Sequence, residues 1–367
     1  MNSLPIEILH SLKTSIQKSI SYLEDQRSSG FVEAIHHMIF PKKAGFIGDV
    51  EKQEGKTFQL AIINNALMDA DSLGFQIDKS GVKEDIRYIL NHKYRDARGG
   101  WKYFPNLPEI PPDADDLAEI LQVLFKFKLD NISEICDEAI SIVFDQNYNS
   151  NGSFETWIMD STSSDLSHKL MLQAIDTKWG KGPDIEVMAN LLYALYIYNP
   201  DRYKNVIQRG VKFITKNIKK AGYWSATWYC GKFYGTFVCS RIISAINPKL
   251  KILNKVHKFL RNSEKKSGGW GSRKSNPTDT ALVLLILTLS NKKLSLKLKL
   301  INRALNYLLK NQIPSGRWKG TYFIQMDPNR CFNISNSRNF STIKYKSDTI
   351  TTAISLKALC SAYTLLS

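Results

Sequence analysis

The sequence predicts an all-α protein that folds as a single (α/α)6 toroid of helix pairs. Three observations support this fold class. A loop with glycine beside or near an aromatic residue recurs along the chain, an apolar helical run follows each loop, and a more amphipathic run lies between them. The two-residue alternation of apolar and polar side chains that marks strands is scarce.

The glycine–aromatic loops recur roughly every 50 to 70 residues, a period typical of repeat architectures. They lie at Gly30 and Phe31, Gly100 and Trp101, Gly152 and Phe154, Gly222 and Trp224, Gly269 and Trp270, and Gly316 and Trp318. The apolar runs that follow are residues 58–67, 117–125, 187–195, 236–246, 280–289 and 350–359. Amphipathic runs at 133–144, 203–218, 250–260 and 294–309 predict an outer ring around the apolar inner ring.

The ends of the chain complete the predicted domain organisation. Leu4, Ile8, Leu12, Ile16 and Ile20 repeat at helical spacing, so residues 1–29 are predicted as an N-terminal helical extension. No proline- or glycine-rich linker divides the remainder, so residues 30–367 are predicted as one toroid domain. No apolar run approaches the 18 residues of a membrane span.

Composition narrows the class of partner. Lys plus Arg is 50 and Asp plus Glu is 34, a net charge of +16 that attracts phosphorylated molecules or anionic membrane surfaces. No nucleic-acid motif accompanies this charge, so we expect no nucleic-acid partner. The basic run at 292–299 is predicted as a solvated face, with peripheral membrane contact as the alternative. Five scattered cysteines without metal spacing favour a cytoplasmic location.

The acidic stretch from Asp113 to Asp116 is the strongest candidate for chemistry. Two prolines precede it and an apolar run follows it, which predicts a helix start with acidic residues at the positive end of the helix dipole. An acidic helix cap is one interpretation. The other is a general acid whose neighbouring carboxylates tune its proton affinity.

Several motifs resemble those of the squalene-hopene cyclase and class II terpene cyclase superfamily. The run from Gln312 to Trp318 fits the Q-x3-G-x-W repeat motif, and the acidic stretch fits D-x-D-D. Gly100 to Phe104 resembles the upstream Gly-Trp-x-x-Phe loop. Residues 184–190 resemble an acidic helix that ends in His, with Asn190 in the His place, and residues 222–236 resemble a loop with two Trp residues followed by Tyr-Gly-Thr.

The resemblance implies a function and a set of roles. Asp115 would be the general acid, Asp113 and Asp116 would share charge with it, and Asn190 would hydrogen-bond the acid or a relay water. The substrate would contact Trp101, Phe104, Glu186, Trp228 and Tyr234. The reaction would be cyclisation of a linear isoprenoid, with a C15 or C20 prenyl diphosphate as the favoured substrate. No cofactor would be required, and Mg²⁺ would be an auxiliary ion only for a diphosphate.

The sequence also departs from the family pattern. Leu117 replaces the usual Thr, and the segment from Tyr322 to Ser347 lacks the family's closing aromatic cluster. Hopene cyclases hold substrate between two toroids, whereas this chain has room for one. A loop, the N-terminal extension, a second copy or a partner subunit must therefore close the cavity.

Three other interpretations of these motifs compete with a class II cyclase. Asp115, Asp116 and Glu119 also fit the D-D-x-x-E motif of class I enzymes that bind Mg²⁺, but only a partial second motif exists, at Asp160 and Ser164. Zinc, as in protein prenyltransferase β-subunits, is not expected because the cysteines lack suitable partners. The remaining alternative is a non-catalytic toroid that binds isoprenoids or acts as a scaffold.

Overall fold

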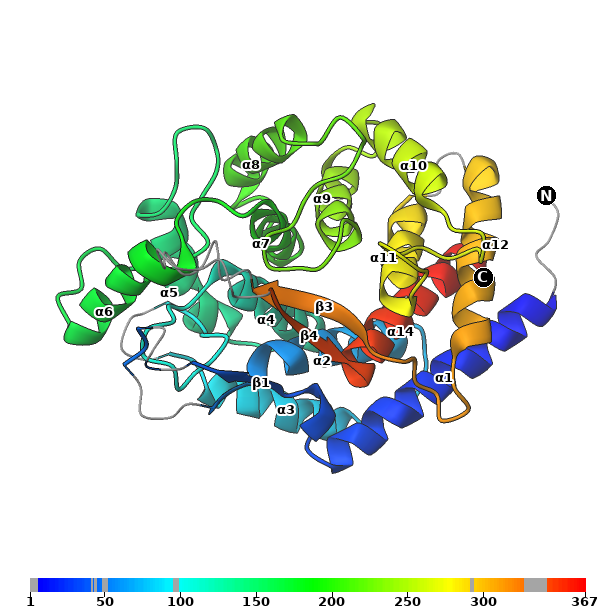
Figure 1. Ribbon diagram of the computed structural model, residues 1–367, viewed down its shortest axis with the longest axis horizontal. Helices are drawn as coiled ribbons and strands as arrows, with labels where there is room; N and C mark the ends of the chain where they lie inside the picture. Colours follow the sequence, from blue (N-terminus) through cyan, green and yellow to red (C-terminus); the bar gives the residue numbers. More distant parts are fainter. Residues whose placement is uncertain are drawn as a thin grey trace.

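Six apolar helices stand in a closed ring within the part of the chain that the computed structural model describes, residues 6–40, 42, 45–47, 52–94, 99–290, 294–326 and 342–367 (Figure 1). Each helix packs on the next, and the last packs back on the first. In ring order they are α2 (Thr57–Ser72), α4 (Ala114–Phe127), α7 (Ile185–Tyr198), α9 (Phe233–Ile246), α11 (Pro277–Thr288) and α14 (Asp348–Leu366). All six lie at the predicted apolar runs.

An outer helix packs against each inner helix. These are α3 (Lys79–Asn91), α5 (Ile132–Asp145), α8 (Lys204–Lys216), α10 (Ile252–Ser263), α12 (Leu294–Asn311) and α1 (Ile6–Ser28). Figure 1 shows α8, α10 and α12 outside α7, α9 and α11. The outer helices are amphipathic because one side faces the inner ring and the other faces water. The all-α toroid predicted from the sequence is therefore confirmed.

Helix α1 is an integral part of this toroid and not an extension to it. Leu12, Ile16 and Ile20 are fully buried in the main core, and α1 packs along α14. The Gln312 side chain, at the end of α12, donates to the Ser15 carbonyl oxygen at 3.0 Å and accepts from its hydroxyl at 2.7 Å. The start of the chain thus supplies the sixth outer helix, so the predicted boundary at residue 29 does not separate two units.

Buried tryptophans from the glycine–aromatic loops end four outer helices in the same way. Each indole N–H donates to a carbonyl oxygen in the last turn of the preceding outer helix, at 2.7 or 2.8 Å: Trp101 to Ile89, Trp224 to Ile214, Trp270 to Leu260 and Trp318 to Leu308. These bonds satisfy carbonyl groups that a helix end otherwise leaves unpaired. The repeated glycine–aromatic loop therefore joins the end of an outer helix to the next inner helix.

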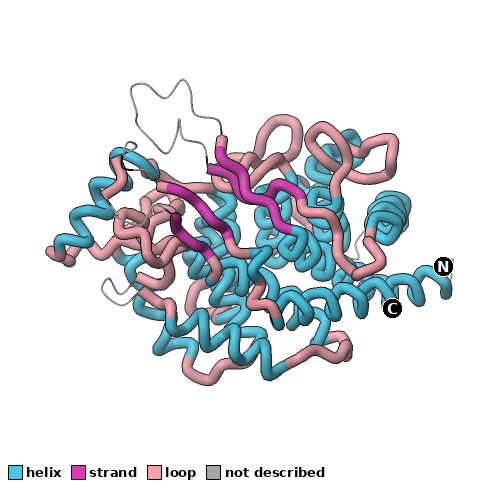
Figure 2. Tube along the Cα trace, turned by 60° about the horizontal axis from the view of Figure 1, so that its bottom comes forward, coloured by secondary structure: helices cyan, strands magenta, loops and turns pink. Residues whose placement is uncertain are grey.

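Two antiparallel hairpins lie on one face of the helical ring, where Figure 2 shows their strands together. The first pairs β1 (His36–Ile39) with β2 (Lys52–Gly55), and the second pairs β3 (Thr321–Met326) with β4 (Ile343–Ser347). The Tyr345 ring stacks on His36 with centroids 4.5 Å apart, and its hydroxyl donates to the Ala34 carbonyl in the short helical turn η1 (Val32–Ala34). The sequence did not predict these strands.

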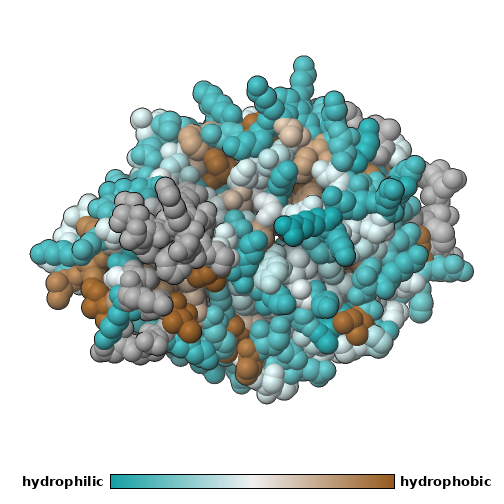
Figure 3. All heavy atoms as spheres, in the orientation of Figure 1, coloured by the Kyte–Doolittle hydropathy of each residue, from teal (hydrophilic) through white to brown (hydrophobic). Residues whose placement is uncertain are grey.

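The remaining helical segment, α6 (Leu166–Ala174), continues into a π-helical turn, η3 (Ile175–Trp179). The face in Figure 3 is mostly hydrophilic, with hydrophobic atoms gathered near α6, where Leu166 and Leu172 are exposed. Helix α14 is long and apolar enough to cross a membrane by composition, but 67% of its most apolar window is buried inside the toroid. Its apolar character is that of an inner-ring helix.

Candidate active site

A cavity lies between the inner ring and the two hairpins, with about 710 Å³ of empty space, part of it open to solvent. Its wall is mostly apolar and aromatic, from Met38, Phe58, Phe104, Ile110, Trp157, Trp179, Val187, Trp228, Ile324, Met326 and Ile343. The hairpins supply Met38, Ile324, Met326 and Ile343, so loops of the same chain close the cavity that the sequence left open.

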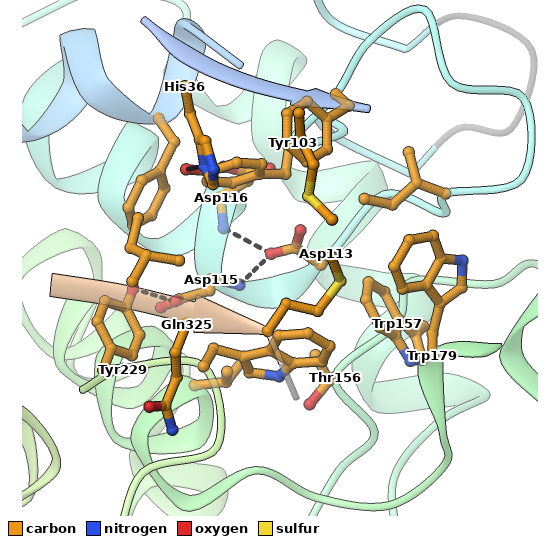
Figure 4. A pocket seen from close by; sticks show the side chains of 18 of the residues that line it. His36, Tyr103, Asp113, Asp115, Asp116, Thr156, Trp157, Trp179, Tyr229 and Gln325 are labelled. Atoms are coloured by element: carbon orange, nitrogen blue, oxygen red, sulfur yellow. Dashed lines mark hydrogen bonds between the residues drawn. The ribbon is translucent and has the colours of Figure 1, made fainter. Parts of the chain in front are cut away.

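The acidic stretch forms both the start of α4 and one wall of this cavity. Asp113 is the N-cap residue, and its Oδ1 accepts from the backbone N–H groups of Asp115 at 2.9 Å and Asp116 at 2.8 Å. The Asp113 N–H in turn donates to the Trp101 carbonyl at 3.1 Å. All three carboxylates line the cavity (Figure 4). Asp113 thus caps the helix, and the same stretch places Asp115 and Asp116 on the cavity wall.

Asp115 has a hydrogen-bond donor on each carboxyl oxygen. Asn190, on α7, donates from Nδ2 to Oδ1 at 2.8 Å. The Tyr229 hydroxyl, from the loop before α9, donates to Oδ2 (Figure 4). Both donors favour the ionised carboxylate and so strengthen Asp115 as an acid. Tyr229 stays a donor because burial and the Asp115 carboxylate raise the pKa of its hydroxyl well above the usual range.

Burial sets the protonation of the three carboxylates. It raises the pKa of Asp115 to about 7, against the opposing effect of the Tyr229 and Asn190 hydrogen bonds. It raises the pKa of Asp113 to about 6, opposed by the backbone N–H groups that this residue caps. Burial and the adjacent Asp113 carboxylate raise the pKa of Asp116 well above its usual range. Burial in the cavity wall thus favours the protonated, uncharged form of each of the three carboxyl groups.

A buried polar layer lies beneath Asp115 on the axis of the ring. Asn190 Nδ2 also donates to Glu119 Oε1 at 2.8 Å, one helical turn along α4 from Asp115. On the other side, Asn190 Oδ1 accepts from Arg241 Nη2 at 2.6 Å and from Gln122 Nε2 at 3.2 Å. Each of these side chains is at most 8% exposed. These hydrogen bonds hold the side chains of the layer in place, with the Arg241 Nε as a buried donor that has no described partner.

The chain belongs to a family with a matching sequence model. Residues 89–337 match the model described as the squalene-hopene cyclase C-terminal domain. This range covers more than half of the 367 residues and includes the acidic stretch, Asn190 and Tyr229. This protein is a member of the squalene-hopene cyclase family. No curated protein sequence matches the chain.

Solved structures resemble this squalene-hopene cyclase family member over its whole length. A variant of the type II terpene cyclase MstE from Scytonema, in complex with its substrate geranylgeranyl dihydroxybenzoate, has a TM-score of 0.73 at 15% identity, covering 99% of this chain and 100% of that one. Another MstE variant, in complex with the product merosterolic acid A, has a TM-score of 0.72 at 16% identity, with the same coverage. Both establish a class II terpene cyclase fold.

A larger enzyme has the same fold in part. ent-Copalyl diphosphate synthase from Streptomyces platensis has a TM-score of 0.56 at 16% identity, covering 83% of this chain but 50% of that one. The MstE structures are covered completely by the toroid described here, so they too contain a single toroid. A single toroid is therefore a recurrent form of this fold.

The residues predicted to bind substrate do not all reach the cavity. Phe104 and Trp228 line it. Trp101 does not: it is fully buried in the main core and ends α3 through its indole, so its role in this squalene-hopene cyclase family member is structural. Tyr234 lines a smaller cavity deeper on the ring axis, where its hydroxyl meets Asn190 Nδ2 at 3.3 Å.

Glu186 likewise lies behind the cavity wall and orients Trp228. Its Oε1 accepts from the backbone N–H groups of Thr227 and Trp228 at 2.5 and 2.9 Å. Asp184 accepts from the Trp228 indole N–H at 2.8 Å. Burial, and then the neighbouring Asp184 carboxylate, raise the pKa of Glu186 to about 8. The acidic pair thus fixes the loop that carries both Trp228 and Tyr229.

Sequence reasoning missed several residues of the site in this family member. Tyr229 directly follows Trp228, so the same loop motif pointed to it. Arg241 is the single charged residue in the sequence of α9, which is a signal for a buried, partnered cation. Trp157, Trp179 and His36 have no local signal, because loops and a hairpin from separate parts of the chain bring them to the cavity.

Proposed function

We propose that this protein is a protonation-initiated terpene cyclase in which Asp115 is the general acid. One observation carries the proposal: a carboxyl group with a raised pKa, two hydrogen-bond donors and an apolar, aromatic cavity in front of it. A non-catalytic toroid would have Asp115 in solvent or paired with Lys or Arg at a helix end. Instead, its described partners are Asn190 and Tyr229, which supports the enzyme over the scaffold.

The proposed reaction begins with proton transfer from Asp115 to the terminal double bond of a linear isoprenoid. The O–H bond breaks, a C–H bond forms, and the positive charge appears on the more substituted carbon. Asn190 and Tyr229 stabilise the carboxylate that remains. Successive double bonds attack the cation and close rings. The final cation loses a proton or captures water.

Aromatic faces on the cavity wall would stabilise the migrating charge. A cation over an aromatic face gains about 0.5 to 2 kcal/mol without meeting a nucleophile that would end the reaction early. Phe104, Trp157, Trp179 and Trp228 provide such faces. Trp157 contacts both Trp179 and Trp228, with ring centroids 6.2 and 5.7 Å apart, so three indoles form one continuous wall.

A linear isoprenoid of C15 or C20 remains the proposed substrate class. The diphosphate predicted from the sequence is one candidate head group. None of the described residues that line the cavity is Lys or Arg, so a prenylated aromatic acid of the kind bound by MstE is an equal candidate. Mg²⁺ as an auxiliary ion, a homodimer, a cytoplasmic location and peripheral membrane contact stay predictions.

The class I alternative has less support. Its second metal motif would have to face Asp115 across the cavity. Asp160, which begins the partial motif, accepts instead from Gln146 at 3.1 Å and from the Thr162 hydroxyl at 2.6 Å, and it does not line the cavity. Across the described part of the chain, no cluster of three or more His, Cys, Asp or Glu side chains is arranged to hold a metal.

The test is incubation of the purified protein with farnesyl diphosphate, geranylgeranyl diphosphate, geranylgeranyl dihydroxybenzoate and squalene, followed by mass spectrometry of the products. We expect a cyclic product from at least one substrate with the wild type and none with Asp115→Asn. Asp279→Asn is the matched control, because Asp279 is another buried carboxyl in the first turn of an inner helix but lies outside the cavity lining. No product from any substrate, or equal product from Asp115→Asn, would refute the proposal.

A further inference from the structure

The orientation of the Asn190 side-chain amide decides whether it strengthens Asp115 as an acid. With Nδ2 toward Asp115, Asn190 donates and stabilises the carboxylate formed on proton transfer. With the amide turned over, Oδ1 would accept a hydrogen bond from the protonated Asp115 carboxyl and hold that proton away from the substrate. An Asn side chain has no intrinsic preference between these two arrangements, so the neighbouring donors and acceptors determine its orientation.

Arg241 determines the orientation of the Asn190 amide. A guanidinium group has five N–H donors and no acceptor, so an atom that it contacts must be an acceptor. Its Nη2 lies 2.6 Å from Asn190 Oδ1, which fixes Oδ1 on the α9 side and Nδ2 on the side of Asp115 and Glu119. A Gln side chain cannot do this alone, because its amide can donate or accept.

Other contacts hold the Arg241 guanidinium in place. Its Nη1 donates to Gln122 Oε1 at 3.1 Å, which leaves Gln122 Nε2 to donate to Asn190 Oδ1. Its planar face lies over the Tyr193 ring, 3.9 Å from the centroid, and Phe237 is 5.0 Å away. Arg241 is 6% exposed. The hydrogen bond to Gln122 and the two aromatic contacts thus hold the guanidinium group beside Asn190 Oδ1.

We propose that Arg241 is a positioning residue for the acid: it locks the Asn190 amide so that Nδ2 donates to Asp115. The proposal rests on the proposed function, because it assigns Arg241 a role in the proton transfer from Asp115. Arg241 does not line the substrate cavity. Its effect is therefore on the chemical step and not on substrate binding.

The test is a double-mutant cycle on cyclisation rate, with the variants Arg241→Met, Arg241→Lys, Asn190→Ala and the double variant Asn190→Ala/Arg241→Met. We expect Arg241→Met to lower kcat by about 10-fold or more with KM within twofold of wild type, the size of one charge-assisted hydrogen bond. Arg241→Lys, which keeps a donor-only cation, should recover part of the loss. In the Asn190→Ala background, Arg241→Met should lower kcat less than twofold further.

The pH profile of kcat distinguishes the positioning role of Arg241 from a contribution to folding alone. When Asn190 no longer donates reliably, the pKa of Asp115 rises, so the fall of kcat at high pH should move to higher pH in Arg241→Met. Loss of folded protein would lower kcat equally at all pH values. The charged and titratable groups around the Asp115–Asn190 pair are Asp113, Asp116, Glu119, Tyr229, Tyr234 and Arg241.

The matched control is Arg202→Met, at an arginine that pairs with Asp137 on the outer surface and should leave kcat unchanged. Equal losses from Arg241→Met with and without Asn190, or a raised KM with unchanged kcat, would overturn the proposal. So would an unshifted pH profile. If Arg241→Met does not fold, the Arg241→Lys variant is compared in both backgrounds by the same criteria. A wild type without cyclase activity would instead refute the proposed function.

Discussion

Removing the hydroxyl of Tyr229 is the most direct way to change the acidity of Asp115, the proposed general acid. Tyr229→Phe removes the donor to Asp115 Oδ2 and leaves the ring, which stacks on Tyr234 with centroids 3.7 Å apart and meets Phe323 at 5.0 Å. Because the side chain is 2% exposed and the phenyl ring keeps these contacts, no water-sized group replaces the lost donor without repacking. The substitution therefore removes the hydrogen bonds of the hydroxyl, to Asp115 and to Tyr234, and leaves the packing of the ring.

The size of the effect follows from the energy of the hydrogen bond to Asp115. A hydrogen bond to a charged group contributes about 1.5 to 3 kcal/mol, and 1.36 kcal/mol corresponds to one pKa unit. The pKa of Asp115, about 7 in the wild type, should therefore rise by about one to two pH units. The carboxylate that forms on proton transfer loses the same stabilisation, which lowers kcat by about 10- to 100-fold.

The assay is kcat against pH from 5 to 9 with a saturating isoprenoid substrate. Asp115 acts in its protonated form, so activity falls as pH rises through its pKa, and the midpoint of this fall should move to higher pH in Tyr229→Phe. Tyr203→Phe is the control, since Tyr203 is also buried but lies outside the cavity lining, and its hydroxyl has no hydrogen-bond partner among the described residues. An unmoved midpoint with unchanged kcat, or an equal shift in the control, would refute the assignment of Tyr229.

Three further predictions concern stability, each measured by urea denaturation. Burial raises the pKa of Glu186 to about 8, above its value in the unfolded chain, so the free energy of unfolding falls as pH rises toward 8. Glu186→Gln should reduce this fall between pH 6 and 8 by about 2 kcal/mol, and an unchanged fall would contradict the prediction. Gly316→Ala should cost about 2 kcal/mol or more, because φ is +91° and a Cβ would lie 2.1 Å from the Lys18 carbonyl oxygen; Gly74→Ala, with φ of +83° and open space, should cost less, and equal costs would show that the close contact is unimportant. Asp69→Asn should destabilise by about 2 kcal/mol, since it leaves two half-buried lysines without their carboxylate; a neutral result would mean that water compensates for the lost charge.

Much of the toroid could be predicted from the sequence because its repeat is local. An apolar helix, an amphipathic helix and a glycine–aromatic loop each have a pattern that a short stretch of sequence contains. Helix α1 looked like an extension for the same reason: its amphipathic pattern is visible, but its partner α14 lies at the other end of the chain. Closure of a ring is not a local property.

The hairpins show a similar limit. Strands β1 and β2 have four residues each, too few for alternation to stand out, and their hairpin packs on Tyr345 from the other end of the chain. Lys297 is a converse case. It lies in a basic run that predicts a solvated face, yet it is 4% exposed because its ammonium donates to the carbonyl oxygens of Leu287 and Ser290 near the end of α11.

The sequence by itself determined the ring of helix pairs, the start of α4 at Asp113 and the identity of the candidate acid, because each depends on residues close together in the chain. The tertiary structure alone decided what surrounds Asp115. Asn190 comes from one repeat, Tyr229 and Arg241 come from the next, and the two hairpins that cover the cavity come from opposite ends of the chain. Whether a carboxyl group is a helix cap or a buried acid depends on its desolvation and its hydrogen-bond donors, and only the packed ring sets these.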